Sequence, residues 1–202
     1  VYCNKTDERH AKRIVELASI TKDDVVCDLG CGDATLLVSV AKETGARCIG
    51  VELDDRLVAA ARSNVQEHGQ EELVQVLHDD CMKADISQVT VVYIFLTMFG
   101  NSMLVTKFLK ELRPGTRIVT RMEEVPGWPL TKSDLVAGST FHSMYMYDLD
   151  AVKAASATDH EARRLLATEF DDYAAPLRPL PSPGGSERKR RATLPKLACT
   201  IS

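Results

Sequence analysis

The chain has 202 residues, of which 45% are hydrophobic, and a formal net charge of −4. This composition is typical of a globular protein with room for one doubly wound domain and an appendage, and no apolar run reaches the ~18 residues of a membrane helix. Residues 151–202 carry nine Lys/Arg and six Asp/Glu, which leaves −7 for residues 1–150, and this acidity disfavours a nucleic-acid substrate and favours a cationic one such as a protein with an exposed lysine.

The first predicted elements are a helix, a strand, a tight turn and a second helix. Residues 6–18 have apolar positions at spacings of three and four, with Thr6 as a plausible N-cap. A β-branched run then ends at Asp28, and Gly30 and Gly32 interrupt the chain before an amphipathic segment at 35–44. Two glycines separated by one residue let the backbone approach a ligand closely, so we expect a binding site at this turn.

Asp28 and Thr35 indicate which ligand the turn accepts. A dinucleotide fingerprint has a glycine where Thr35 stands, and a carboxylate at Asp28 would repel a diphosphate. The same carboxylate suits a ligand with a positively charged end, such as the amino group and sulfonium of S-adenosylmethionine. The pattern Val-x-Asp-x-Gly-x-Gly-x-Ala resembles motif I of class I S-adenosylmethionine-dependent methyltransferases, with Ala34 in place of the usual third glycine.

Two further strands are predicted to end in carboxylates. The strand at 47–51 ends at Glu52, which is placed to accept both hydroxyl groups of a ribose, while Asp54 or Asp55 is expected to cap the next helix. The strand at 73–78 ends at Asp79 and Asp80, one of which is placed to accept a hydrogen bond from an adenine amino group. A solvated turn is the alternative for this acidic pair.

The second half of the domain is predicted to surround the acceptor. Residues 89–96 form an apolar run typical of a central strand, and its end, residues 95–99 with Phe95 and Thr97, should border the methyl group. A helix around 103–112, a strand at 116–121 and a terminal hairpin follow. An aromatic channel for the acceptor would be lined by Trp128, Tyr145, Tyr147 and Tyr93, although core packing is preferred for Tyr93.

The character of the chain changes after residue 148. Residues 149–175 are a possible helical extension, and residues 176–202 are rich in Pro, Ser and Gly and contain a basic run at 188–191, which predicts a flexible basic tail. The basic run at 188–191 would be part of a solvated tail, a docking patch for a partner or a nuclear-import signal. The expected compartment is the cytoplasm, with the nucleus or mitochondrion as alternatives, and the six cysteines are expected to be reduced. No metal site is predicted, because no pair of Cys or His residues has a second pair to complete it.

The resemblance to class I methyltransferases covers residues 1–148. A narrower resemblance is to the archaeal broad-specificity protein lysine methyltransferases and the mitochondrial ATP synthase c-subunit lysine methyltransferases. The segments that carry it are residues 28–33, 50–54, 95–104, 111–120 and 127–128. It implies a Rossmann-like doubly wound α/β fold with a seven-stranded, mostly parallel sheet and a C-terminal antiparallel hairpin. It also implies N-methylation of protein lysines with S-adenosylmethionine. The implied cofactor-binding residues are Tyr2, Thr6, Asp28, Gly30, Cys31, Gly32, Glu52, Leu53, Asp80, Cys81 and Phe95.

Some departures from these relatives leave the acceptor open. Residues 97–99 replace a more polar segment, and Arg121 stands where a histidine is frequent. The chain lacks Asn/Asp-Pro-Pro-Tyr after its fourth strand, which speaks against amide and exocyclic base nitrogens. No catalytic base is assigned, although Glu123 and Glu124 are candidates. A small-molecule methyltransferase, a nicotinamide-dependent oxidoreductase and an inactive cofactor-binding scaffold are the alternative functions.

Overall fold

The computed structural model describes residues 8–96, 98–136 and 139–158. Three predicted site residues, Tyr2, Thr6 and Thr97, lie outside the described residues, as does the predicted tail at 176–202.

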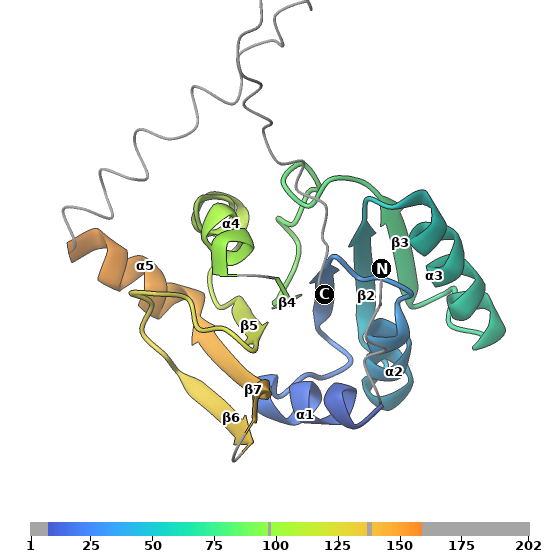
Figure 1. Ribbon diagram of the computed structural model, residues 1–202, viewed down its shortest axis with the longest axis horizontal. Helices are drawn as coiled ribbons and strands as arrows, with labels where there is room; N and C mark the ends of the chain where they lie inside the picture. Colours follow the sequence, from blue (N-terminus) through green and yellow to red (C-terminus); the bar gives the residue numbers. More distant parts are fainter. Residues whose placement is uncertain (1–7, 97, 137–138, 159–202) are drawn as a thin grey trace, which may run out of the picture.

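A seven-stranded sheet with the order β3-β2-β1-β4-β5-β7-β6 forms the centre of the domain (Figure 1). Strands β1 to β5 pair in parallel, whereas β7 runs antiparallel to both β5 and β6. The predicted α/β fold, with its mostly parallel sheet and C-terminal antiparallel hairpin, is confirmed. The strands are β1 (Val25–Leu29), β2 (Arg47–Glu52), β3 (Val74–His78), β4 (Val91–Ile94), β5 (Arg117–Arg121), β6 (Lys132–Val136) and β7 (Ser139–Asp148).

Helices cover both faces of the sheet (Figure 1). One face packs against α1 (Glu8–Ala18), α2 (Thr35–Thr44) and α3 (Asp55–Glu67), and the other against α4 (Met98–Glu111) and α5 (Leu149–Thr158). None of the helices in the described part of the chain is long and apolar enough to span a membrane.

Alternation along the strands decides which helix layer each side chain meets. In β1, Val26 belongs to the hydrophobic cluster under α1 to α3, whereas Cys27 and Leu29 belong to the cluster under α4 and α5. Every residue of β4 is buried, as predicted for a central strand covered on both faces. The side chains of the even-numbered residues of β1, including Asp28, therefore face the layer formed by α1 to α3.

The sequence predicts the start of α3 correctly but not the start of α4. Asp54 is the N-cap of α3, as predicted, and its carboxylate accepts hydrogen bonds from the backbone N–H groups of Arg56 and Leu57. Helix α4 begins at Met98, earlier than the sequence indicated, so that Gly100 and Asn101 lie inside its first turn. At the other end of the domain, β7 runs directly into α5, whose Leu149 and Val152 are buried in the core.

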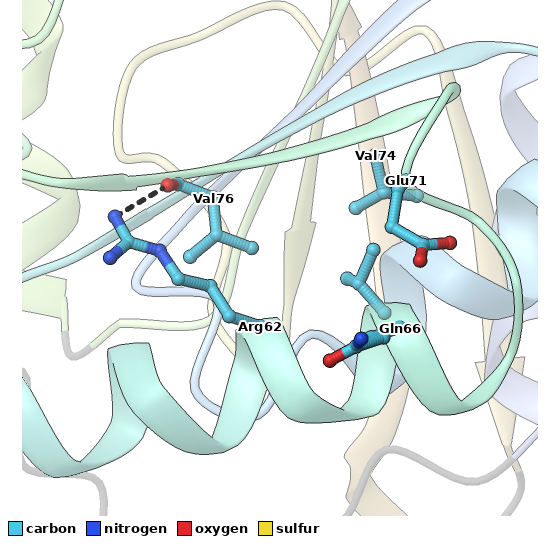
Figure 2. Close-up of a pocket in the computed structure, with 6 residues that line it drawn as sticks. Arg62, Gln66, Glu71, Val74 and Val76 are labelled. Atoms are coloured by element: carbon cyan, nitrogen blue, oxygen red, sulfur yellow. Dashed lines mark hydrogen bonds between the residues drawn. The ribbon is translucent and has the colours of Figure 1, made fainter.

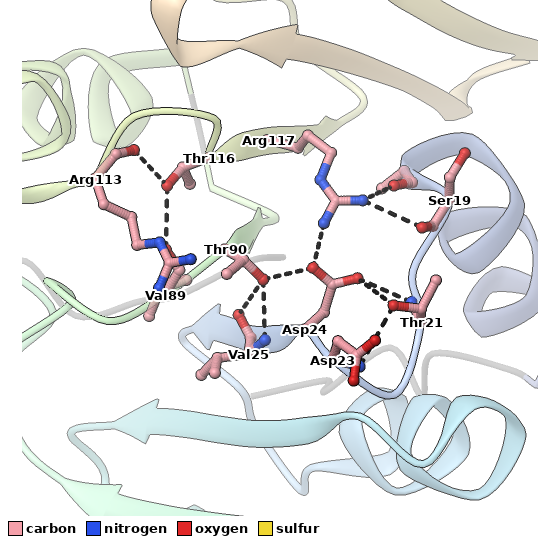
Figure 3. A network of polar contacts seen from close by, with 11 residues as sticks. Ser19, Thr21, Asp23, Asp24, Val25, Val89, Thr90, Arg113, Thr116 and Arg117 are labelled. Carbon is pink, nitrogen blue, oxygen red and sulfur yellow. Dashed lines mark hydrogen bonds and ion pairs between the residues drawn. The ribbon is translucent and has the colours of Figure 1, made fainter.

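A polar network fixes the amino-terminal edge of the sheet (Figure 3). Asp24, just before β1, accepts hydrogen bonds from the Thr21 backbone, the Thr90 hydroxyl and the Arg117 guanidinium. Burial by itself raises the pKa of the Asp24 carboxyl, but these partners outweigh it and lower the pKa below its usual value. Arg117 also donates to the carbonyls of Ala18 and Ser19, which ties the end of α1 to the starts of β1, β4 and β5.

Candidate functional site

The glycine-rich turn after β1 bends over the carboxyl end of β2. Gly30 and Gly32 have φ angles of 92° and 56°, in the left-handed region that glycine adopts at little cost. The N–H groups of Gly30 and Cys31 both donate to the Val51 carbonyl, at 2.8 and 3.1 Å. Because α2 starts directly after this turn, its amino-terminal end faces the carboxyl edge of the sheet.

Glu52 connects this turn to the start of α3. Its carboxylate, in a residue only 4% exposed, accepts hydrogen bonds from the backbone N–H groups of Gly32 at 3.0 Å, Leu53 at 2.8 Å and Asp54 at 3.0 Å. Glu52 therefore holds two backbone segments of the site together. Its role in binding a ribose stays a prediction.

Asp28 is a buried carboxylate at the end of β1. The residue is 5% exposed and lies beside Tyr93 of the neighbouring strand β4. None of the described residues donates a hydrogen bond to this carboxylate or forms an ion pair with it. Burial, together with the charges of Glu52 and Asp33, raises its pKa to about 8. A carboxylate in this state fits a cationic ligand, because a positive charge next to it would relieve the electrostatic cost.

Close packing under the turn explains a glycine in β2. A Cβ atom on Gly50 would lie 2.6 Å from the Cys31 sulfur and 3.0 Å from Leu37 Cδ1. Cys27, Cys31 and Cys48 are free and buried, and their reduced state in the cell stays a prediction. Burial raises the pKa of each of these thiols, so they are poor nucleophiles.

Asn64, which sequence reasoning missed, clamps the turn from the side of α3. Its side-chain NH₂ donates to the Asp33 carbonyl at 2.8 Å and to the Thr35 hydroxyl at 3.3 Å. The residue lies on a helix facing the turn, and an asparagine in an amphipathic helix gives no signal of such a contact in a single sequence.

The predicted adenine side of the site lies after β3. Asp80 Oδ1 accepts the Met82 N–H at 2.9 Å, and the Asp80 carbonyl accepts the N–H groups of Lys83 and Ala84. Asp80 therefore organises a turn, as in the alternative interpretation of the acidic pair, and both Asp80 and Cys81 remain partly accessible. Leu53, at the end of β2, is 49% exposed. The cofactor contacts of these three residues stay predictions.

Three of the aromatic residues predicted to line a channel, Trp128, Tyr145 and Tyr147, come together in the layer beneath α4 and α5, whereas Tyr93 is buried on the face of Asp28. The Tyr147 hydroxyl accepts the Val125 N–H at 2.9 Å, and the rings of Trp128 and Tyr147 meet edge to face at 5.5 Å. Tyr145 and Tyr147 are buried in the core, and Trp128 is partly buried against it. Their role in a channel stays a prediction.

A buried cation lies on β5, the strand that follows β4 in the sheet on the side away from β1. Arg121, at the end of β5, is 2% exposed, and its guanidinium carbon lies 4.5 Å from the centre of the Phe95 ring. Arg121 follows Val119 on the strand face that packs under α1 to α3, so it shares a face with Asp28 and Tyr93. The sequence singled out Arg121 only as a departure from relatives.

Two surface cavities of the described residues lie away from these carboxylates. A shallow cavity of about 280 Å³ lies between α3 and the edge strand β3, where Arg62 donates to the Val76 carbonyl at 3.2 Å (Figure 2). This contact satisfies a carbonyl group on an edge strand. A second cavity, of about 540 Å³, lies between α1 and β6.

Comparison with known proteins gives consistent matches. A family profile described as the ANTKMT methyltransferase domain matches residues 28–132. A protein-lysine N-methyltransferase of Saccharolobus islandicus is 35% identical over 144 residues, which cover 70% of this chain and 89% of the relative. The ATP synthase c-subunit lysine N-methyltransferase of Xenopus laevis is 26% identical, and the match covers 67% of this chain and 58% of the relative. The crystal structure of an RNA methyltransferase from Salinibacter ruber in complex with S-adenosyl-L-homocysteine has a TM-score of 0.68 and 33% identity, and the match covers 71% of this chain and 92% of that chain.

Proposed function

The chain belongs to the ANTKMT methyltransferase family and is an S-adenosylmethionine-dependent methyltransferase, and we propose that it methylates lysine side chains of a protein. The observation that carries the proposal is the 35% identity to a protein-lysine N-methyltransferase over 89% of that relative's length. The net charge of −7 in residues 1–150 supports it, because an acidic enzyme attracts a cationic acceptor.

We assign the cofactor contacts according to the chemistry of each strand end. Asp28 would receive the ammonium of the cofactor's amino-acid part, since it is buried and has no cationic partner among the described residues. Glu52 would accept the ribose hydroxyls, and Asp80 the adenine amino group. When bound, S-adenosylmethionine supplies a methyl group on a sulfonium, so that a C–N bond forms to the acceptor as the C–S bond breaks.

Arg121 would favour the neutral form of the acceptor amine. A lysine ammonium has a reference pKa of ~10.4 and must lose a proton before it can act as a nucleophile. The buried guanidinium of Arg121 lies over Phe95, at the strand end where we expect the acceptor. A second positive charge at this place is disfavoured, so an entering lysine would lose its proton more readily.

The proposal is tested by incubating the purified chain with tritium-labelled S-adenosylmethionine and either cell-lysate protein or total RNA. We expect label in protein, and mass spectrometry should map it to lysine. The RNA arm is included because the Salinibacter ruber neighbour is described as an RNA methyltransferase. The Glu52→Ala variant, which we expect not to bind the cofactor, is the negative control. Label confined to RNA, or protein label on residues other than lysine, would contradict the proposal.

A further inference from the structure

Asn101 is a buried amide without hydrogen-bond partners. It lies in the first turn of α4 and is 1% exposed. Neither its side-chain oxygen nor its side-chain nitrogen has a hydrogen-bond partner in the described part of the chain. Native proteins pair nearly all their buried polar groups, and an exception calls for an explanation such as a partner supplied by a ligand.

The side chain of Asn101 belongs to the sheet-facing stripe of its helix. Leu104 and Phe108 follow it at spacings of three and four, which places all three residues on one face of α4. Leu104 and Phe108 belong, with Ile94 and Ile118 of the sheet, to the hydrophobic cluster under α4 and α5. Asn101 therefore continues an apolar stripe with an amide, where a leucine would fit the pattern.

Asn101 lies at the carboxyl edge of the sheet. Helix α4 connects the parallel neighbours β4 and β5, so its amino-terminal turn follows the carboxyl end of β4. This is the edge at which Asp28 ends β1, one strand away. The strand order changes direction between β1 and β4, and open α/β sheets bind their ligands at such a switch point.

The strand order also indicates which part of the reaction Asn101 meets. The cofactor contacts proposed above run from Asp80 after β3, through Glu52 on β2, to Asp28 on β1. Asn101 follows β4, which lies beyond β1 on the side away from β3. A group there is remote from the adenine and near the amino-acid part of the cofactor, which carries the sulfonium methyl. A group there would meet either the amino-acid part of the cofactor or the methyl acceptor bound next to it.

We propose that Asn101 is a positioning residue, whose side-chain oxygen accepts an N–H from the acceptor amine and so aims the nitrogen lone pair at the methyl group. The inference rests on the proposed lysine N-methyltransferase function. An amide suits this task because its oxygen accepts a hydrogen bond but does not take up a proton at neutral pH. The amine therefore keeps its geometry after losing its proton to solvent, and alignment of the reacting atoms lowers the barrier to transfer.

The test compares Asn101→Leu, Asn101→Asp and the control Ser102→Ala with the wild-type full chain. Leucine has a similar volume and no polar atoms, whereas aspartate keeps an acceptor oxygen in the same place. Ser102 is exposed on the same turn. Methylation is measured at the lysine that mass spectrometry maps for the wild-type enzyme, together with cofactor affinity by calorimetry and thermal melting.

For Asn101→Leu we expect a fall in kcat of about tenfold or more with cofactor affinity within about twofold of wild type, because only the alignment of the acceptor is lost. Asn101→Asp should recover part of the lost kcat, and its pH–rate profile should shift because a titratable group now contacts the amine. Ser102→Ala should behave as the wild type.

Any of three results for Asn101→Leu would overturn the inference. The first is an unchanged kcat, and the second is a loss of cofactor affinity in parallel with the loss of activity. The third is a melting temperature much lower than that of the wild type. The last result would mean that the amide has a structural partner. If the wild-type chain itself yields no methyllysine, the proposed function fails first, and the variants are not needed to show it.

Discussion

Replacing Asp28 with asparagine should stabilise the protein without cofactor, and the gain should grow with pH. The folded protein has a carboxyl pKa of about 8 at this position against an ordinary value of 3.8. Between these two values the folded state binds about one proton more than the unfolded state, so stability falls as pH rises, by about 1.4 kcal/mol per pH unit. Asparagine does not titrate and removes this dependence.

The measurement is thermal or urea unfolding of wild type and Asp28→Asn from pH 5 to pH 8.5. For a chain of this size, 1 kcal/mol corresponds to about 2–4 °C in Tm, so the gap should widen by about 3–5 °C per pH unit between pH 5 and 7 and level off above pH 8. Titrations common to both proteins cancel in the difference. Saturating S-adenosylmethionine should stabilise the wild type but not the variant. A difference that is flat between pH 5 and 7 would refute the reasoning, because it would mean that the folded protein already holds Asp28 ionised beside a partner.

Three other substitutions test the site and its support. Glu52→Ala should abolish cofactor binding in calorimetry and lower stability by about 1–3 kcal/mol, because three backbone N–H groups lose their acceptor; unchanged binding would rule out the ribose assignment. Gly50→Ala should cost about 1–3 kcal/mol in urea unfolding, and a Cys31→Ala background should return part of it, since the Cys31 sulfur is the nearest obstacle; additive effects would contradict this packing. Asp24→Asn should lower stability at pH 7 by about 1–3 kcal/mol, and the deficit should shrink as pH falls below the ordinary carboxyl value, where the wild type also loses the interaction; a deficit independent of pH would contradict the lowered pKa.

The fold could be predicted well from the sequence because its signals are local. The apolar runs, the glycine-rich turn and the caps each depend on a few neighbouring residues, and α2 occupies the residues 35–44 that were predicted. Asp54 illustrates this, since its role as a cap follows from its place before the helix. The sequence predicts a later start for α4, because Gly100 and Asn101 are typical of a loop, whereas both residues lie within the helix.

The site could be predicted only in part, because its decisive contacts join residues far apart in the chain. Asp28 and Glu52 stand at strand ends, where a parallel sheet must bring them to one edge. Asn64 contacts the turn from α3 and Arg121 contacts Phe95 from the end of β5, and no spacing rule in the sequence predicts either contact. The aromatic residues were predicted by type alone, and type does not say which face of β7 they occupy. Tyr145 and Tyr147 share the face under α4 and α5 with Leu29, on the opposite side of the sheet from Asp28.

The free energy that burial of the Asp28 carboxylate costs the protein without ligand should also make the site selective for a cationic ligand. A carboxylate that burial and two neighbouring acids hold partly protonated destabilises the protein without ligand. A ligand whose positive charge restores the ionised form recovers that free energy on binding, whereas a neutral or anionic ligand recovers none of it. Cofactor affinity should therefore increase with pH up to about pH 8, in the range where stability without cofactor decreases. A nicotinamide dinucleotide would bring its diphosphate to the same edge and face repulsion there, so the charge at Asp28 would discriminate between the two cofactors that a glycine-rich turn of this kind can bind.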